Sequence, residues 1–133
     1  YAKQLVAAPA VPWQVGTLTI QPIFTPGHTA GSLCYLIGDN LFSGDVLFIE
    51  GCGICFDVES AWALFASLEK LKSLMTSRPH THIFPGHTYA RPPGQRFSDV
   101  LRYNMYLHFN NKQDFAAFRL RAGQNIQKMM EFK

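Results

Sequence analysis

Three short, largely apolar runs in this sequence each end at a glycine that is followed directly by a histidine or an aspartate. These Gly-His and Gly-Asp pairs stand at residues 27–28, 44–45 and 86–87. Glycine lets the backbone turn sharply and leaves room beside its neighbours, so each pair predicts a strand end from which a side chain projects. Imidazole nitrogens and carboxylate oxygens are zinc ligands, and an aspartate can bridge two ions. Together His28, Asp45 and His87 predict a metal site, although a single histidine near a turn is more often only hydrogen-bonded.

The residues around these pairs predict short strands separated by turns. Alternating or apolar runs predict strands over residues 17–24, 33–37, 41–43 and 81–84. Pro22 marks the first of them as an edge strand or a bulged one, because proline cannot donate a ladder hydrogen bond. The Gly-Asp-Asn turn at 38–40 predicts a hairpin, and the glycine-rich stretch 44–53 is expected to be loop.

Helices are expected after the strands. Apolar residues recur at spacings of four, three and four at Leu64, Leu68, Leu71 and Met75. Ser60 is the expected N-cap of that helix, and Ser98 is the expected N-cap of a helical C-terminal part with breaks near residues 110–111 and Gly123. Strands first, then helix, strand and helices is an α/β or α+β order.

Composition predicts one domain with a packed core, since 47% of the 133 residues are hydrophobic. The chain opens on Tyr1 and an apolar stretch without a cap or turn, so we expect residues 1–133 to be a single incomplete domain of a longer protein. Prolines and glycines interrupt the uncharged run 4–38, and no basic segment precedes an apolar one, so neither a membrane span nor a secretory signal is expected. Three cysteines are too few for a disulfide framework, which favours a cytoplasmic location.

The charge is unevenly distributed along the chain. Residues 1–66 hold one lysine and five acidic residues, a net charge of −4, whereas residues 67–133 hold eleven Lys or Arg and four acidic residues, a net charge of +7. The basic half could attract an acidic partner, although solvated Lys and Arg on helices are the more common explanation for such a charge.

The residues at 25–32, 43–48, 51–53 and 84–87 resemble the metallo-β-lactamase superfamily, specifically its glyoxalase II-like thioester hydrolases. The resemblance is close over residues 15–90 and loose in the helical tail. It implies a four-layer αββα sandwich that holds two metal ions, usually zinc, with iron or manganese as alternatives. By this resemblance His28 binds the first metal, His87 binds the second, and Asp45 bridges them and is the catalytic residue.

The sequence departs from the family pattern in its metal ligands. The H-x-H-x-D-H segment, which supplies the family's remaining ligands, does not occur in this chain and would lie upstream of Tyr1. His80-Thr81-His82 is not that segment, because no acidic ligand follows it, and we expect it to be part of a loop and a strand. The chain by itself is therefore expected to be inactive, and to be the C-terminal part of a complete enzyme.

A second departure concerns the substrate. Where glutathione-thioester hydrolases have a lysine and a hydroxyl-bearing aromatic residue, this chain has Ile54 and Phe56, whereas Tyr89 is retained and could donate a hydrogen bond to a substrate. The residues at 47–57, 92–95 and 118–121 resemble hydrolases encoded with polyketide synthases, which are thought to remove acyl groups from carrier proteins. The resemblance thus implies hydrolysis of a thioester on an acyl carrier protein, or of a small thioester, by a metal-bound hydroxide, with no role for nucleic acid.

Several alternatives stay open. Hydrolysis of hydroxyacylglutathione is the nearest; sulfur dioxygenase chemistry on one iron uses a similar scaffold; and a non-catalytic module that binds an acidic partner is a third. Hydrolysis of β-lactams is the least favoured, since fold does not determine substrate. Cys52 and Cys55 have the spacing of a redox motif or half a zinc knuckle, but a second Cys or His pair is absent from the sequence, and we expect them to be structural. The sequence leaves the oligomeric state undetermined.

Overall fold

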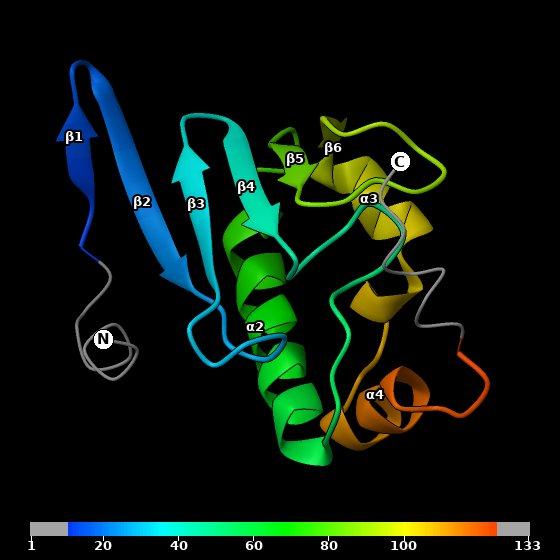
Figure 1. The fold of residues 1–133 in the computed structure, drawn as a ribbon. Helices are drawn as coiled ribbons and strands as arrows, with labels where there is room; N and C mark the ends of the chain where they lie inside the picture. The colour runs from blue at the N-terminus through cyan, green and yellow to red at the C-terminus, as the bar shows by residue number, and fades with distance from the viewer. Residues whose placement is uncertain (1–10, 125–133) are drawn as a thin grey trace.

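The computed structural model describes residues 11–124, whose strands form one six-stranded sheet in the order β1-β2-β3-β4-β5-β6 (Figure 1). The strands are β1 (Trp13–Val15), β2 (Leu18–Phe24), β3 (Leu33–Ile37), β4 (Asn40–Gly44), β5 (His82–Pro85) and β6 (Gln95–Arg96). The helices are α2 (Val58–Thr76), α3 (Phe97–Tyr103), the 3-10 helix η1 (Met105–Leu107) and α4 (Lys112–Arg119). The expected α/β order is confirmed.

The connections within the sheet bring three loops to one edge. The pairs β1–β2, β2–β3 and β3–β4 are antiparallel, whereas β4 and β5 are parallel and joined through α2. Parallel neighbours end at the same edge of a sheet, so the loops that follow β4 and β5 lie side by side. The end of β2 pairs with the start of β3, which brings the loop between them to the same edge.

One face of the sheet forms the core with α2. Ile23, Cys34, Leu41 and Ile83 are buried on successive strands of that face, in one cluster with the apolar stripe of α2. The stripe contains the four residues expected from the helical spacing, Leu64, Leu68, Leu71 and Met75, and all four are buried. The helical period therefore predicted which side of α2 faces the core.

The opposite face of the sheet is aromatic. Trp13 meets Tyr35 edge to face with ring centroids 6.0 Å apart, and Phe42 stacks on Phe84 at 5.3 Å. Phe42 is 42% exposed, and no helix of residues 11–124 covers this face (Figure 1). A second sheet, as the expected sandwich requires, would pack against such a surface.

The two expected N-caps are wrong. α2 begins three residues earlier than expected, because the Asp57 carboxylate accepts a hydrogen bond from the Ser60 backbone N–H at 2.8 Å, and this hydrogen bond lowers the pKa of Asp57. Ser98 lies inside α3, whose N-cap is Arg96. There β6 runs directly into the helix, and the backbone carbonyls of Thr81 and Pro79 accept the hydrogen bonds of the first helical N–H groups. A backbone acceptor from another segment leaves no capping signal in the local sequence.

Among the described residues Pro22 pairs with β3 on one side only, because β1 pairs with β2 no further than Ile20. Pro22 therefore lies at an edge position of the sheet, as expected. The expected break near residues 110–111 is confirmed, since α4 begins after Asn111, which is its N-cap, but the helical tail is also interrupted at Asn104, where no break was expected. No helix among residues 11–124 combines the length and the apolar character that crossing a bilayer requires.

Stability is expected to fall at alkaline pH because of Cys34. Burial raises the pKa of this thiol from 9.0 to about 11. Below pH 9 the thiol is protonated in both states, whereas between pH 9 and about 11 only the unfolded chain releases the proton, which favours unfolding. Urea unfolding across this range should show a steeper loss of unfolding free energy in the unmodified protein than in Cys34→Ala. Equal slopes would contradict the assignment to Cys34.

Candidate metal centre

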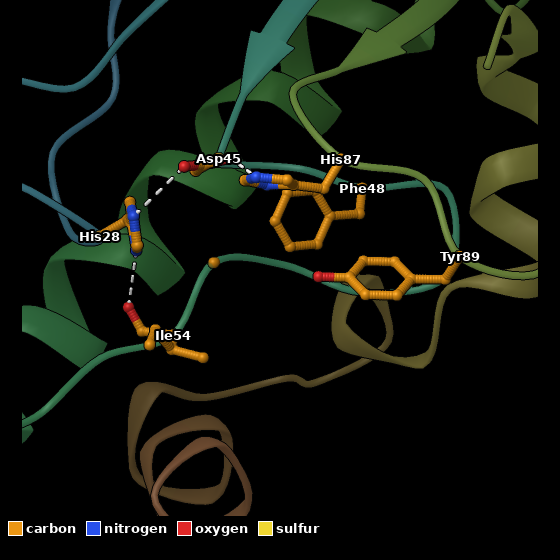
Figure 2. A pocket seen from close by; sticks show the side chains of 7 residues that line it. His28, Asp45, Phe48, Ile54, His87 and Tyr89 are labelled. Carbon is orange, nitrogen blue, oxygen red and sulfur yellow. Dashed lines mark hydrogen bonds and ion pairs between the residues drawn. The ribbon is translucent and has the colours of Figure 1, made fainter. Parts of the chain in front are cut away.

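Three loops bring His28, Asp45 and His87 together at one edge of the sheet (Figure 2). His28 lies between β2 and β3, Asp45 follows β4 directly, and His87 follows β5. The Oδ1 atom of Asp45 lies 2.6 Å from Nδ1 of His87, and its Oδ2 atom lies 3.5 Å from Nε2 of His28. The carboxylate thus stands between the two imidazoles with one oxygen toward each.

A backbone carbonyl sets the orientation of His28. Nδ1 of His28 lies 2.9 Å from the Ile54 carbonyl oxygen. A carbonyl can only accept, so Nδ1 carries a proton, and Nε2 is the ring nitrogen that faces Asp45. Histidines that bind metals are held in this way, with the second ring nitrogen donating to a carbonyl or carboxylate.

The donor atoms fit zinc in type but do not complete a site. Two imidazoles and a carboxylate are ligands that zinc accepts, and a carboxylate with one oxygen toward each imidazole suits a bridge between two ions. Within residues 11–124 no group of three His, Cys, Asp or Glu side chains is arranged to hold a single ion. Each ion would therefore have one imidazole and one carboxylate oxygen from these three residues, which is fewer than the four ligands that zinc usually takes.

Two glycines let the loops approach one another. A Cβ atom on Gly53 would lie 2.0 Å from the Asp45 carbonyl oxygen and 2.9 Å from Cβ of His28. A Cβ atom on Gly86 would lie 2.8 Å from Oδ1 of Asp45. Gly53 therefore requires glycine because of space, since its nearest neighbour is backbone, whereas a side chain at Gly86 would displace the Asp45 carboxylate.

The segment 44–53 is irregular, as expected, but it is part of the core. Leu47 and Cys52 form an isolated bridge, and both are buried. The side chain of Asn104, also buried, donates to the carbonyls of Phe48 and Gly51 at 2.9 and 2.8 Å. Asn104 lies more than fifty residues along the chain, and no sequence signal identified it.

Asn104→Ala is expected to lower the free energy of unfolding by about 2 kcal/mol, because it leaves two carbonyls without their donor. Chemical denaturation measures the change. Asn110→Ala is the matched control, since Asn110 is exposed and its replacement should change stability by less than about 0.5 kcal/mol. Equal effects of the two substitutions would show that the Asn104 hydrogen bonds contribute little.

A cavity of about 100 Å³ lies beside the three candidate ligands, and Phe48, Gly53, Ile54 and Tyr89 line its remaining wall (Figure 2). The Phe48 ring packs against both His87 and Tyr89, with centroids 5.8 and 5.5 Å apart. Burial, and then the negative charge of Asp45, raise the pKa of Tyr89, so its hydroxyl is protonated at neutral pH and can donate a hydrogen bond. Two of the three expected substrate-binding residues, Tyr89 and Ile54, thus lie at the cavity.

Phe56 lies elsewhere. Its side chain is 77% exposed and borders a separate, open hollow between residues 55–58 and 120–124. Only Cys55 separates Ile54 from Phe56, and the chain turns away from the metal centre between them. A role for Phe56 in substrate binding stays a prediction.

The other candidate clusters are structural. Burial raises the pKa of Cys52 to about 12 and also raises that of Cys55, so both thiols are protonated and unreactive at neutral pH. His82 begins β5, at the end of the strand away from the metal centre, and His80 lies 3.4 Å from Asp39. The expectation that residues 80–82 are a loop and strand detail is confirmed.

The family model described as "Metallo-beta-lactamase superfamily" matches residues 6–87. A protein named "Probable polyketide biosynthesis zinc-dependent hydrolase BaeB", from Bacillus velezensis, is 44% identical over 110 residues, which are 82% of this chain and 48% of that protein. A hydroxyacylglutathione hydrolase from Shewanella halifaxensis is 45% identical over 68 residues, 51% of this chain and 25% of that protein. The chain spans about half the length of the polyketide-biosynthesis relatives that it matches.

Solved structures have the same fold. A metallo-beta-lactamase from Staphylococcus aureus superimposes with a TM-score of 0.79 at 24% identity, over 89% of this chain and 39% of that one. ETHE1 from Myxococcus xanthus superimposes with a TM-score of 0.76 at 29% identity, over 93% of this chain and 55% of that one. The arrangement of sheet and helices is therefore one that solved proteins of this fold contain.

Proposed function

The chain belongs to the metallo-beta-lactamase superfamily, and from that premise we propose that it is part of a zinc-dependent hydrolase of thioesters, acting on acyl groups carried by an acyl carrier protein. The observation that carries the proposal is the position of Asp45, with one carboxylate oxygen toward each of two histidines beside an apolar cavity. Relatives named zinc-dependent hydrolases of polyketide biosynthesis support the metal and a hydrolytic role in that biosynthesis.

Each of the three candidate ligands has its own role in binding two ions. His28 and His87 would each bind one ion, and Asp45 would bridge the pair. When bound, zinc supplies Lewis acidity toward a carbonyl oxygen and a water nucleophile at neutral pH, which are what thioester hydrolysis requires. The Ile54 carbonyl keeps Nε2 of His28 available as a ligand, and Phe48 packs against the His87 ring.

The other residues of the cavity position the substrate. The Tyr89 hydroxyl donates a hydrogen bond to the acyl or thiol part of the thioester. Phe48 and Ile54 present apolar surface that excludes bulk water. The thiol product leaves without strong acid assistance, because the pKa of a thiol is about 8.5.

The cavity favours an uncharged thiol carrier. None of the described residues that line it is a lysine or an arginine, so the anionic groups of glutathione would find no cation there. The pantetheine part of a carrier protein's arm is uncharged from the thiol up to the phosphate that joins it to the carrier, and the net charge of +7 over residues 67–133 suits the acidic body of a carrier. Hydrolysis of hydroxyacylglutathione is the second candidate, favoured by the relatives of that name.

The test uses the full-length protein that contains this chain. Bound zinc is measured per chain, and the hydrolysis of an acylated carrier protein is compared with that of an acylglutathione. Two zinc ions and a preference for the carrier are expected. A preference for the glutathione thioester would favour the second candidate, and absence of both metal and turnover would leave a non-catalytic module that binds an acidic partner.

Ile54→Lys is expected to raise kcat/KM for an acylglutathione about three- to fivefold, because a cation at the partly exposed cavity wall gains one ion pair with the substrate. Steady-state kinetics on the acylglutathione and on the acyl carrier protein measure the change. Ile54→Met, which has similar size and no charge, is the control and should leave the ratio of the two substrates unaltered. An unchanged ratio in Ile54→Lys would show that this wall does not contact the thiol carrier.

A further inference from the structure

A buried arginine lies behind the metal centre. Arg119, the last residue of α4, is 2% exposed. Its Nη1 atom donates to the Cys52 carbonyl at 3.2 Å, its Nη2 atom donates to the Gln124 side-chain oxygen, and its guanidinium lies 4.8 Å from the centre of the Tyr106 ring. Among residues 11–124 no carboxylate forms a salt bridge with Arg119, and its Nε atom is buried without an acceptor.

Burying a guanidinium without a carboxylate is costly, and an apolar side chain of the same volume would fill the space at less cost. Packing alone therefore does not account for an arginine at this position. The guanidinium also donates a hydrogen bond to the Cys52 carbonyl. Cys52 is the first residue of the turn Cys52-Gly53-Ile54.

This turn is in direct contact with the candidate ligands. The third residue of the turn, Ile54, presents the carbonyl that accepts the hydrogen bond from Nδ1 of His28 at 2.9 Å. The middle residue, Gly53, lies so close to His28 and Asp45 that a single added Cβ atom would clash with both residues. A displacement of the Cys52 carbonyl therefore shifts the Ile54 carbonyl and the imidazole that depends on it.

We infer that Arg119 is a positioning residue for His28, acting through the Cys52-Gly53-Ile54 turn. Arg119 donates to the Cys52 carbonyl and so keeps the Ile54 carbonyl in place as the acceptor for Nδ1 of His28. His28 then stays in the tautomer whose Nε2 atom is available to a metal ion. The inference rests on the proposed function in that it takes His28 as a metal ligand.

The test compares Arg119→Met and Arg119→Lys with the unmodified full-length protein. Nitrogen NMR of the metal-free protein, at a pH of about 8.5 where histidine is normally neutral, reports which ring nitrogen of His28 carries the proton. Competition with a chelator reports the zinc affinity. In Arg119→Met we expect a mixture of His28 tautomers and a zinc affinity about tenfold lower, at the small end of the effects of residues that orient a ligand. Arg119→Lys, which retains a charged donor, should recover part of both.

Arg121→Met is the matched control. Arg121 follows α4 and donates to the Tyr106 hydroxyl and the Phe118 carbonyl, but it has no hydrogen bond to the turn. Its replacement should leave the His28 tautomer and the zinc affinity unchanged even if it lowers Tm. An Arg119→Met protein that folds with the His28 tautomer of the unmodified protein would overturn the inference.

If Arg119→Met does not fold, Gln124→Ala provides the measurement, because it removes one acceptor of the guanidinium from a partly exposed position. A smaller change of the His28 tautomer in the same direction supports the inference, and an unchanged tautomer in both Gln124→Ala and Arg119→Lys overturns it. Failure of the unmodified protein to bind zinc would instead count against the proposed function, since the tautomer measurement needs no metal.

Discussion

Asp45→Asn is expected to abolish thioester hydrolysis by the full-length protein and to lower its zinc content. The substitution keeps the size of the side chain but replaces one oxygen by a nitrogen that cannot bind a metal ion, so the side chain can no longer bridge two ions. The loss of kcat/KM should exceed the about 10–100-fold that removal of a residue orienting a ligand costs. Zinc per chain and steady-state kinetics on an acyl carrier protein measure the two effects.

Asp39→Asn is the control for this substitution. Asp39 also lies beside a histidine, His80, at 3.4 Å, but at an exposed position next to the opposite end of β5. Its replacement should leave zinc content and kinetics unchanged. Full activity of Asp45→Asn would show that Asp45 is not the bridging ligand and that the proposed mechanism is wrong.

Gly53→Ala is expected to lower the free energy of unfolding by about 3 kcal/mol and to disturb the metal centre at the same time. The added methyl group would lie 2.0 Å from the Asp45 carbonyl oxygen, which is backbone and cannot rotate away. Relief of the clash therefore has to move the loop that carries Asp45 or the ring of His28. Urea unfolding and zinc content, measured on the same preparation, should fall together.

Gly51→Ala makes the same chemical change two residues earlier. A Cβ atom on Gly51 would come no closer than 3.9 Å to another residue, which is ordinary contact. We expect this variant to be neutral or more stable by up to about 1 kcal/mol, because alanine restricts the unfolded chain. If Gly53→Ala behaved like Gly51→Ala, the close approach of the turn to the ligands would not limit the site.

Much of the fold follows from short-range patterns in the sequence. Alternation and apolar runs predicted β2 to β5, and the spacing of Leu64, Leu68, Leu71 and Met75 predicted the buried side of α2. The helix starts were less accurate, because at α2 the aspartate three residues before Ser60 is the cap, and at α3 the acceptors are backbone carbonyls from another segment. Neither β1 nor the short β6 was expected, since strands of three and two residues have no period to detect.

The candidate ligands followed from the sequence because each stands beside a glycine at the end of a run, a signal contained within a few neighbouring residues. Their meeting at one place depends on the parallel pairing of β4 with β5 and on the contact of β2 with β3, which bring positions 28, 45 and 87 to one edge of the sheet. The sequence alone thus determined which side chains are chemically suited to bind metal. Only the tertiary structure decided how these side chains are held. Asn104 and Arg119 form hydrogen bonds with the segment 44–53 although they lie 56 and 67 residues further along the chain from their partners. Hydrogen bonds over such separations depend on how the helices pack, which no local sequence pattern specifies.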